Sequence, residues 1–358
     1  MLETAKAASY WHPLENGKIQ CDLCPHFCQL QEGQRGLCYI RGVENQQMQL
    51  YSYGRSSGFC LDPIEKKPLN HFLPGTSVLS FGTAGCNLTC KFCQNWDMSK
   101  SRKMQTLASN ASPETLAKAC LQTQARSIAY TYNDPVIFIE YALDVAAACR
   151  EVDVKSVAVS AGFISDKARE PFFASMDAAN IDLKGFSKTF YKKLCGADLD
   201  IVKETLIYLA QKQDTWLEVT NLIIPGENDS EEELTQMCEW YSENLGCDVP
   251  LHFSAFHPDY KMLKHPRTPI DTLLKARNIA RKSGLHFVYT GNVSDPASAS
   301  TYCPNCESLL IERDRYQLGR WELDEKGQCK KCQHLIAGVF EKQAGNWGAK
   351  RQVLRFVD

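Results

Sequence analysis

The sequence predicts an α/β fold in which helices cover a parallel β-sheet and a small cysteine-rich module stands on either side. From residue 77 onward, short apolar runs typical of strands alternate with longer segments typical of helices. The runs are apolar throughout, as in strands that are buried on both faces of a parallel sheet. Clusters of four cysteines precede and follow this region, and such clusters are typical of small metal-binding modules.

The individual elements can be read from the same pattern. Helix starts are indicated by Ser112 before a proline, by Ser230 with Glu233 as a capping box, and by Thr268 before a proline, and Gly284 indicates a helix end. We expect strands at 77–81, 127–131, 156–160, 179–183, 216–224, 251–256 and 286–290.

Three units follow from this reading of the 358 residues. Residues 1–76 form an N-terminal four-cysteine module with a lead-in of short strands and turns. Residues 77–298 form the main α/β domain, and residues 299–358 form a second cysteine module and a tail. A chain of this length can bury one large core and carry two small appendages.

Composition excludes several classes of function. Forty basic and 42 acidic residues give a net charge of −2, which lacks the excess of basic residues that is typical of nucleic-acid-binding proteins. No apolar run approaches the roughly 18 residues that a membrane helix requires. The first residues lack the apolar core of a signal peptide, so we expect the 17 cysteines to lie in a reducing cytoplasm.

The central chemical signal is the stretch FGTAGCNLTCKFCQNW, in which Cys86, Cys90 and Cys93 have C-x3-C-x2-C spacing. A cuboidal iron–sulfur cluster is normally held by four cysteines, so three leave one iron free for a substrate or cofactor. Structural zinc wants four ligands, and no other cysteine or histidine lies in the loop. The alternatives are an incomplete zinc site and three buried thiols. The apolar run before the loop places it after a strand, where catalytic loops of α/β barrels lie.

The two flanking clusters have metal-ligand spacing. The first consists of Cys21, Cys24, Cys28 and Cys38, which can close around zinc or an auxiliary iron–sulfur cluster, and spacing alone does not choose between them. His26 is an alternative ligand there, and the site serves either folding or electron transfer. The second has the two-knuckle spacing of a zinc ribbon, with iron as the minor alternative, and consists of Cys303, Cys306, Cys329 and Cys332.

Several motifs together resemble one family. CPHFC at 24–28, DPIEKKPLNHFLPGT at 62–76, GTAGCNLTCKFCQN at 82–95, TYNDP at 131–135, NIDLKGF at 180–186 and GNWGAKR at 345–351 resemble the AmmeMemoRadiSam-system radical S-adenosylmethionine (SAM) enzymes, relatives of the activases of pyruvate formate-lyase. The resemblance covers nearly the whole chain. It implies a partial (β/α) TIM-like barrel and a [4Fe–4S] cluster on the three central cysteines with SAM at the open iron. It also implies an external one-electron reductant of the flavodoxin or ferredoxin type and work beside Memo-type and Ammecr-type proteins.

The resemblance also suggests which residues contact SAM. Asn133 and Asp134 stand where the activases have a Gly-Gly-Glu motif that receives the methionine ammonium; an ordinary Asx turn is the alternative. Asp182 and Lys184 match the family's Asp-Leu-Lys signature and share one strand face, with a structural ion pair as the alternative. Three further expected contacts are Ser160, Gly162 and His257.

The sequence therefore predicts reductive cleavage of SAM to a 5'-deoxyadenosyl radical, which removes hydrogen from an unidentified substrate. Activation of a glycyl-radical enzyme, with a polypeptide as substrate, is the first alternative. A multi-cluster electron-transfer protein and a zinc-based scaffold are alternatives from other classes. No side-chain acid–base pair is expected to dominate, because the cofactor carries the difficult chemistry.

Overall fold

A nine-stranded sheet forms the centre of the computed structural model, which describes residues 5–103, 107, 109–212 and 214–356. Its order is β16-β15-β14-β13-β12-β11-β9-β8-β20, and the seven strands from β9 to β16 are parallel neighbours. Their bounds are β9 (Ser77–Phe81), β11 (Ser127–Tyr130), β12 (Lys155–Ser160), β13 (Ala178–Asp182), β14 (Trp216–Ile223), β15 (Leu251–Ala255) and β16 (Val288–Gly291). The predicted α/β fold with a parallel sheet is confirmed.

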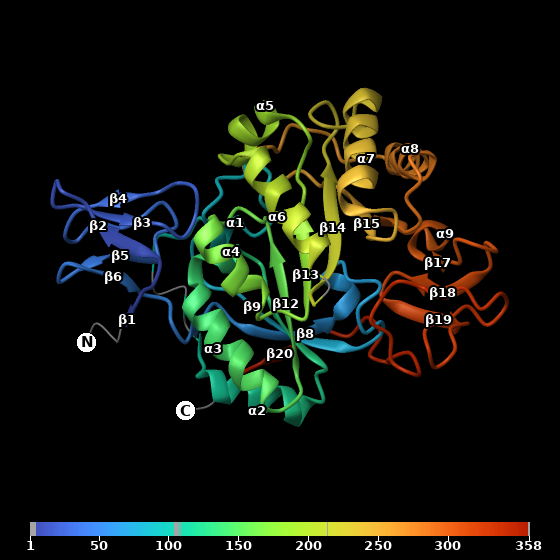
Figure 1. The fold of residues 1–358 in the computed structure, drawn as a ribbon, viewed down its shortest axis with the longest axis horizontal. Coiled ribbons are helices and arrows are strands. Elements are labelled where there is room, and N and C mark those ends of the chain that lie inside the picture. The colour runs from blue at the N-terminus through green and yellow to red at the C-terminus, as the bar shows by residue number, and fades with distance from the viewer. Residues whose placement is uncertain (1–4, 104–106, 108, 213, 357–358) are drawn as a thin grey trace.

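Helices connect these parallel strands and cover one side of the sheet (Figure 1). They bury aliphatic and aromatic side chains against strands that are themselves almost wholly buried, which explains the uninterrupted apolar runs. The connecting helices are α2 (Pro113–Thr123), α3 (Ile139–Arg150), α4 (Asp166–Phe173), α6 (Leu199–Gln211), α7 (Glu231–Leu245) and α8 (Ile270–Lys282). Shorter turns are η1 (Ile64–Lys66), α1 (Trp96–Ser99), η3 (Pro135–Phe138), α5 (Lys188–Phe190) and η4 (Tyr191–Cys195).

The N-terminal module consists of small antiparallel sheets at one side of the main sheet (Figure 1). One sheet has the order β1-β6-β5 and another the order β2-β3-β4. Strand β7 pairs instead with β10, a short strand from the main domain. The bounds are β1 (Lys6–Ala7), β2 (Trp11–Pro13), β3 (Ile19–Cys21), β4 (Gln29–Leu30), β5 (Arg41–Glu44), β6 (Gln47–Leu50), β7 (Arg55–Ser56) and β10 (Ser109–Asn110).

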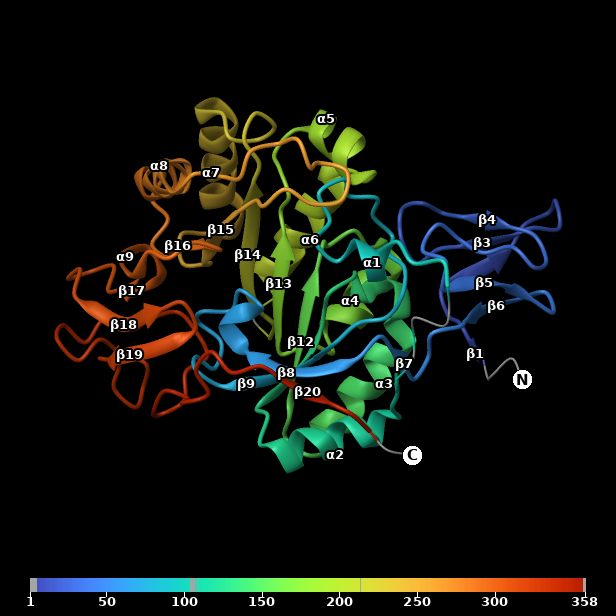
Figure 2. The same cartoon turned by 180° about the vertical axis from the view of Figure 1, so that it is seen from behind.

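The C-terminal module lies at the opposite side of the sheet from the N-terminal one (Figures 1 and 2). It is an antiparallel sheet of β17 (Thr301–Tyr302), β18 (Leu309–Asp314) and β19 (Gln317–Trp321), preceded by α9 (Pro296–Ala299). His71 anchors it, because one ring nitrogen lies 2.6 Å from the carbonyl oxygen of Ala337 and the other 2.5 Å from the Tyr289 hydroxyl.

The predicted boundaries of the central unit, 77–298, leave out two strands that belong to its sheet. Strand β8 (Phe59–Pro63) pairs antiparallel with β9, and β20 (Gln352–Leu354), from the tail, pairs antiparallel with β8. The tail thus contributes an edge strand to the main sheet. Such long-range pairing depends on the rest of the fold, so the local sequence pattern did not show it.

Two details of helix capping differ from expectation. Thr268 does not cap α8, because Pro269 occupies the N-cap and the Thr268 hydroxyl donates to the Ile223 carbonyl. Ser230 caps α7 as predicted, but the Glu233 carboxylate accepts from the backbone amide of Phe186. In both places a tertiary partner takes the group that local capping would use.

No helix in the described ranges has the length and apolar character needed to cross a membrane.

Candidate functional site

The three central cysteines line one cavity of about 260 Å³ at the carboxyl ends of the parallel strands. In α/β folds this is where the chemistry lies, because the loops that leave the strands converge there. Other lining side chains come from four of the parallel strands or the loops after them, namely Asn133, Asp134, Asp182, Lys184, Thr220 and Asn292. The described lining residues include no fourth cysteine.

The side chain of Asn133 holds the loop that carries the cysteines through two hydrogen bonds to its backbone. Its amide nitrogen donates to the carbonyl oxygen of Gly85 at 2.8 Å, and its amide oxygen accepts from the backbone nitrogen of Thr83 at 3.1 Å. Asn133 lines the cavity, yet its hydrogen bonds serve the cysteine loop. It therefore positions the loop, which the sequence pattern did not indicate.

Gly85 brings the cysteine loop against the N-terminal module. Its φ is +80°, and a Cβ added there would lie 1.9 Å from the carbonyl oxygen of Cys38. Alanine at this position is strained by the left-handed backbone, and its Cβ would also overlap the carbonyl oxygen of Cys38. We expect this overlap to lower the free energy of unfolding of Gly85→Ala by about 1–3 kcal/mol beyond the cost of the backbone conformation. Iron content per chain should fall as well.

Gly17 provides the matched control for this substitution. Its φ is +74°, but nothing lies within 4 Å of the Cβ that alanine would add. Gly17→Ala should therefore cost only about 1 kcal/mol, with iron content unchanged. Urea denaturation and iron analysis of both variants measure the difference, and equal losses would refute the close approach of loop and module.

The three thiols have different surroundings. Burial raises the pKa of Cys86 to about 12. The pKa of Cys90 is lowered, first by a hydrogen bond with Cys195 and further by the charges of Lys184 and Lys100. Cys93 Sγ lies 3.1 Å from the Ser99 hydroxyl. Positive charge beside the thiols favours their thiolate form, which is the form that binds metal.

Asp134 is held by backbone and hydroxyl donors. Its carboxylate accepts from the amides of Val136 and Ala161, each at 3.1 Å, and from the Ser160 hydroxyl at 3.0 Å. Burial raises its pKa to about 6. The bond to Val136 is the Asx turn given above as the alternative. Ser160 and Gly162 do not line the cavity; Ser160 accepts from the Gly162 amide and orients Asp134.

Asp182 and Lys184 form an ion pair in the cavity wall, with Nζ and Oδ2 2.8 Å apart. Burial opposes the charge on Lys184, but Asp182 outweighs it, so the pKa of the lysine lies well above its usual value. The lysine is therefore a permanent cation beside the three thiols. This ion pair is the structural alternative given above, and both side chains also line the cavity of the three cysteines.

His257 lies apart from this group. Its side chain is exposed and contacts the carbonyl oxygen of Pro258, and it is not among the lining residues. Sequence reasoning missed Lys100 and Ser254, which do line the cavity. Neither stands in a motif, so only the fold could have found them.

The N-terminal cysteines surround a small cavity of their own directly behind the cysteine loop. Its wall contains Cys21, Cys24, Cys28 and Cys38 together with Arg41, His26 and Asn87. His26 lies 2.6 Å from the carbonyl oxygen of Asn87, which belongs to the cysteine loop. The two cysteine groups, about 60 residues apart in the sequence, thus share a wall.

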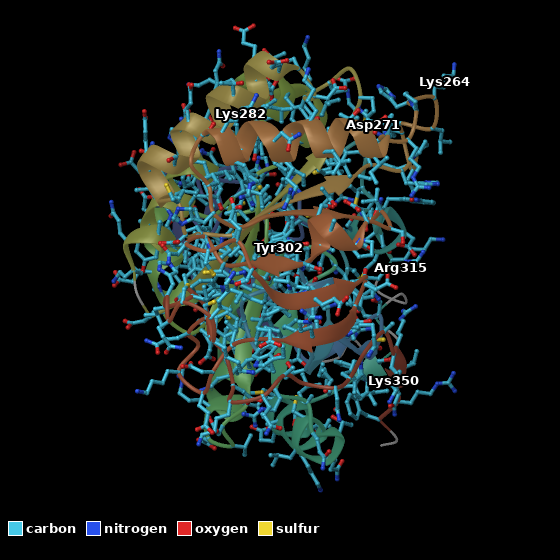
Figure 3. All side chains as sticks on the ribbon, turned by 90° about the vertical axis from the view of Figure 1, so that its right-hand side faces the viewer. Lys264, Asp271, Lys282, Tyr302, Arg315 and Lys350 are labelled. Carbon is cyan, nitrogen blue, oxygen red and sulfur yellow. The ribbon has the colours of Figure 1, made fainter. Side chains whose placement is uncertain are left out.

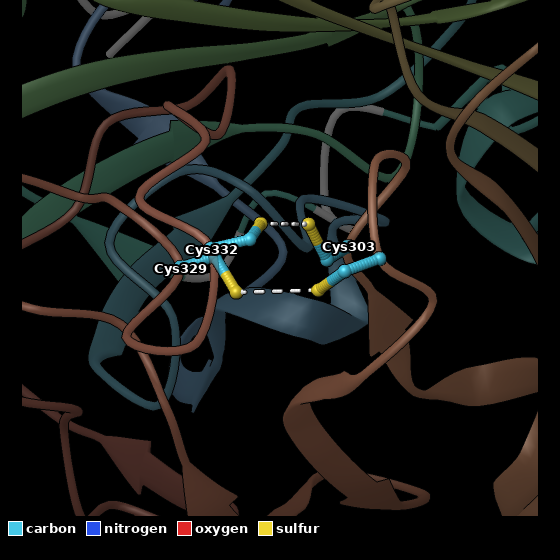
Figure 4. A group of neighbouring side chains, drawn as sticks. Cys303, Cys329 and Cys332 are labelled. Atoms are coloured by element: carbon cyan, nitrogen blue, oxygen red, sulfur yellow. Dashed lines mark hydrogen bonds between the residues drawn. The ribbon is translucent and has the colours of Figure 1, made fainter.

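The C-terminal cysteines are drawn close together (Figure 4). Cys303 and Cys332 have their sulfurs 3.5 Å apart, and Cys306 and Cys329 have theirs 3.8 Å apart. Four sulfurs at the usual Zn–S distance of about 2.3 Å in a tetrahedron lie about 3.8 Å apart. Among the described residues this is the one group of such ligands whose atoms all lie within 4.8 Å of one another.

Comparison with known proteins agrees with the fold. Residues 81–238 match the profile of the Radical SAM superfamily. An uncharacterised protein of Methanocaldococcus jannaschii is 41% identical over 333 residues, which cover 92% of this chain and 98% of that protein. The chain belongs to the radical SAM superfamily.

More distant similarities include activating enzymes. A 4-hydroxyphenylacetate decarboxylase activating enzyme of Clostridioides difficile is 22% identical over 171 residues, 45% of this chain and 54% of that enzyme. A domain of the pyruvate-formate lyase-activating enzyme from Bacteroides vulgatus superposes with a TM-score of 0.42 at 14% identity, over 46% of this chain and 99% of that chain. Streptococcus suis SuiB, bound to its precursor peptide SuiA, gives 0.49 at 13% identity, over 64% of this chain and 51% of that chain.

Membership of the superfamily implies a [4Fe–4S] cluster and SAM, and the cavity fits both. It offers three thiols without a fourth, which is the donor set of a cluster with one open iron. It also offers a cation in Lys184 and an anion in Asp182, suited to the carboxylate and ammonium groups of an amino acid.

Proposed function

We propose that this protein cleaves SAM reductively and uses the resulting radical to remove hydrogen from a substrate. The observation that carries the proposal is the cavity in which Cys86, Cys90 and Cys93 meet Asp182 and Lys184. When bound, the reduced cluster supplies one electron to the SAM sulfonium, which breaks into methionine and a 5'-deoxyadenosyl radical. An external one-electron donor of the flavodoxin or ferredoxin type supplies that electron.

The chain's own residues bind and orient the cluster and SAM. The three cysteines hold the cluster, and Lys184 and Asp182 receive the charged end of SAM. Asn133 fixes the cysteine loop, while the Ser160 hydroxyl, which accepts from the Gly162 amide, donates to Asp134. His257 contributes only if the loop that carries it moves over the cavity.

A test of this proposal measures SAM binding and cleavage by anaerobically reconstituted protein. After reduction with dithionite, the wild type should release 5'-deoxyadenosine. Lys184→Met should weaken SAM binding in equilibrium dialysis by about 10-fold or more, because a charge-assisted hydrogen bond is worth about 1.5–3 kcal/mol. Lys188→Met, which breaks a lysine–aspartate pair on the surface, is the control and should bind SAM as the wild type does. A wild type that binds SAM without ever cleaving it would refute the proposal.

We further propose that the N-terminal cysteines hold a second iron–sulfur cluster and the C-terminal cysteines hold zinc. The C-terminal sulfurs have the spacing of a single tetrahedral ion, whereas the N-terminal four line a cavity without reaching that spacing. A cluster needs the wider spacing, because irons and sulfides lie between its ligands. The shared wall at Asn87 favours passage of an electron to the central cluster.

The wider context rests on the motifs and on one group of relatives. The six motifs support a role beside Memo-type and Ammecr-type proteins in a reducing cytoplasm. The similarity to 4-hydroxyphenylacetate decarboxylase activating enzymes favours a second candidate, the activation of a glycyl-radical enzyme. Against that candidate, Asn133 and Asp134 replace the glycines of the activases' motif.

A further inference from the structure

A second cavity, of about 460 Å³, adjoins the cysteine cavity. Ser254 at the end of β15 and Asn292 after β16 line both cavities. A volume of this size suits a small molecule. The two cavities are therefore neighbours at the carboxyl ends of the same strands.

Three distant parts of the chain build the second cavity. Glu65 and Asn70 come from the segment before β9, Ser254 and Asn292 from the ends of β15 and β16, and Arg313 from the C-terminal module. Arg315 and Tyr316, in the turn between β18 and β19, complete the wall (Figure 3 labels Arg315). The C-terminal module therefore contributes residues to the wall of this cavity.

The lining is strongly basic. Arg267, Arg313 and Arg315 line the cavity, and none forms an ion pair with a carboxylate within 4.0 Å among the described residues. Lys66 also lines it but is paired with Asp62 at 2.8 Å. Glu65 is the one carboxylate in the described lining. Three guanidinium groups that form no ion pair with a described carboxylate surround one cavity and favour an anionic occupant.

Arg313 is the most informative of the three. It is 1% exposed, and its terminal nitrogens donate to the Thr301 hydroxyl and to the Asn70 carbonyl, each at 2.7 Å. Its Nε has no partner, and neither has Oε2 of the buried Glu65. A buried charge is costly unless it is paired.

The other fully buried arginine shows what a paired one looks like in this chain. Arg41, also 1% exposed, binds both carboxylate oxygens of Glu140 at 2.7 and 3.0 Å. No carboxylate takes that role for Arg313. The cavity it faces can provide one through a ligand.

We propose that the second cavity binds the substrate of the radical reaction, and that this substrate is a small organic anion with a carboxylate or phosphate group. This inference rests on the function proposed above. The acidic group of the substrate contacts Arg267, Arg313 and Arg315, and the carbon that loses hydrogen extends past Ser254 and Asn292 toward the cysteine cavity. Guanidinium groups suit both kinds of acid, because they bind two oxygens at once.

Isothermal titration of the reconstituted protein tests this assignment, with potassium phosphate and sodium malonate as probes in Tris chloride. We expect saturable binding of at least one probe, and the stronger one identifies the acidic group. Arg267→Gln/Arg315→Gln should weaken that binding at least 10-fold. Both side chains are exposed, so the fold should persist; Arg315→Gln alone replaces the double variant if circular dichroism shows unfolding.

Arg320→Gln is the matched control. It removes the same charge from an exposed position on β19 that does not line the cavity, and it should bind the probe as the wild type does. The assignment is overturned if neither probe binds the wild type saturably, or if the cavity variant binds as tightly as the control.

Failure of this inference can be told from failure of the proposed function. Wild type that releases 5'-deoxyadenosine but binds neither anion overturns the substrate assignment alone. Wild type that binds an anion but never cleaves SAM overturns the proposed function.

Discussion

Replacing Cys86, Cys90 and Cys93 together by alanine is expected to remove about four irons per chain and to abolish release of 5'-deoxyadenosine. The three thiols are the sulfur ligands that the cavity offers, so their loss leaves nothing to hold a cluster there. Iron and zinc analysis after anaerobic reconstitution, with chromatography of the reduced reaction, measures both effects. Zinc and the iron of the N-terminal site should remain.

Cys247→Ala is the control for this prediction, because Cys247 is a half-buried free cysteine outside all three groups. It should keep full iron content and full cleavage. Iron that persists unchanged in the triple variant would show that the central cysteines hold no cluster, and an electron-transfer or scaffold role would then gain ground.

Arg41→Met should destabilise the protein by about 3–5 kcal/mol, because it leaves the Glu140 carboxylate buried without its partner. The pair joins the N-terminal module to α3, and Arg41 also donates to the carbonyl oxygen of Ser9 at 2.7 Å. The N-terminal module should consequently become sensitive to protease. Urea denaturation measures the loss of stability.

A double variant separates the ion pair from other effects of the substitution. Arg41→Met/Glu140→Leu should recover most of the loss, since a buried pair replaced by apolar groups is often neutral. Arg126→Met, which breaks an exposed pair with Glu341, should cost less than about 1 kcal/mol. Similar losses for the buried and the exposed pair would contradict the prediction.

The parallel strands and the helices between them could be predicted because each is encoded locally. Strand β9 has the predicted bounds, and β11 to β16 differ from theirs by two residues or fewer at each end. Apolar runs of this length are typical of strands that are buried on both faces, so the local pattern is enough to predict these strands. The caps at Thr268 and Glu233 were predicted wrongly in part, because distant backbone groups compete for their side chains.

The sequence alone predicted the three cysteine groups, because a spacing typical of metal ligands is visible in the chain. It also predicted that Asp182 and Lys184 are neighbours, since side chains two residues apart in an extended segment point to the same side. Only the tertiary structure decided that Asn133 fixes the cysteine loop and that the N-terminal cysteines lie behind it. It alone brought Glu65, Ser254 and Arg313 to one cavity. Contacts between residues so far apart depend on the packing of whole elements, and a local pattern carries no record of that packing.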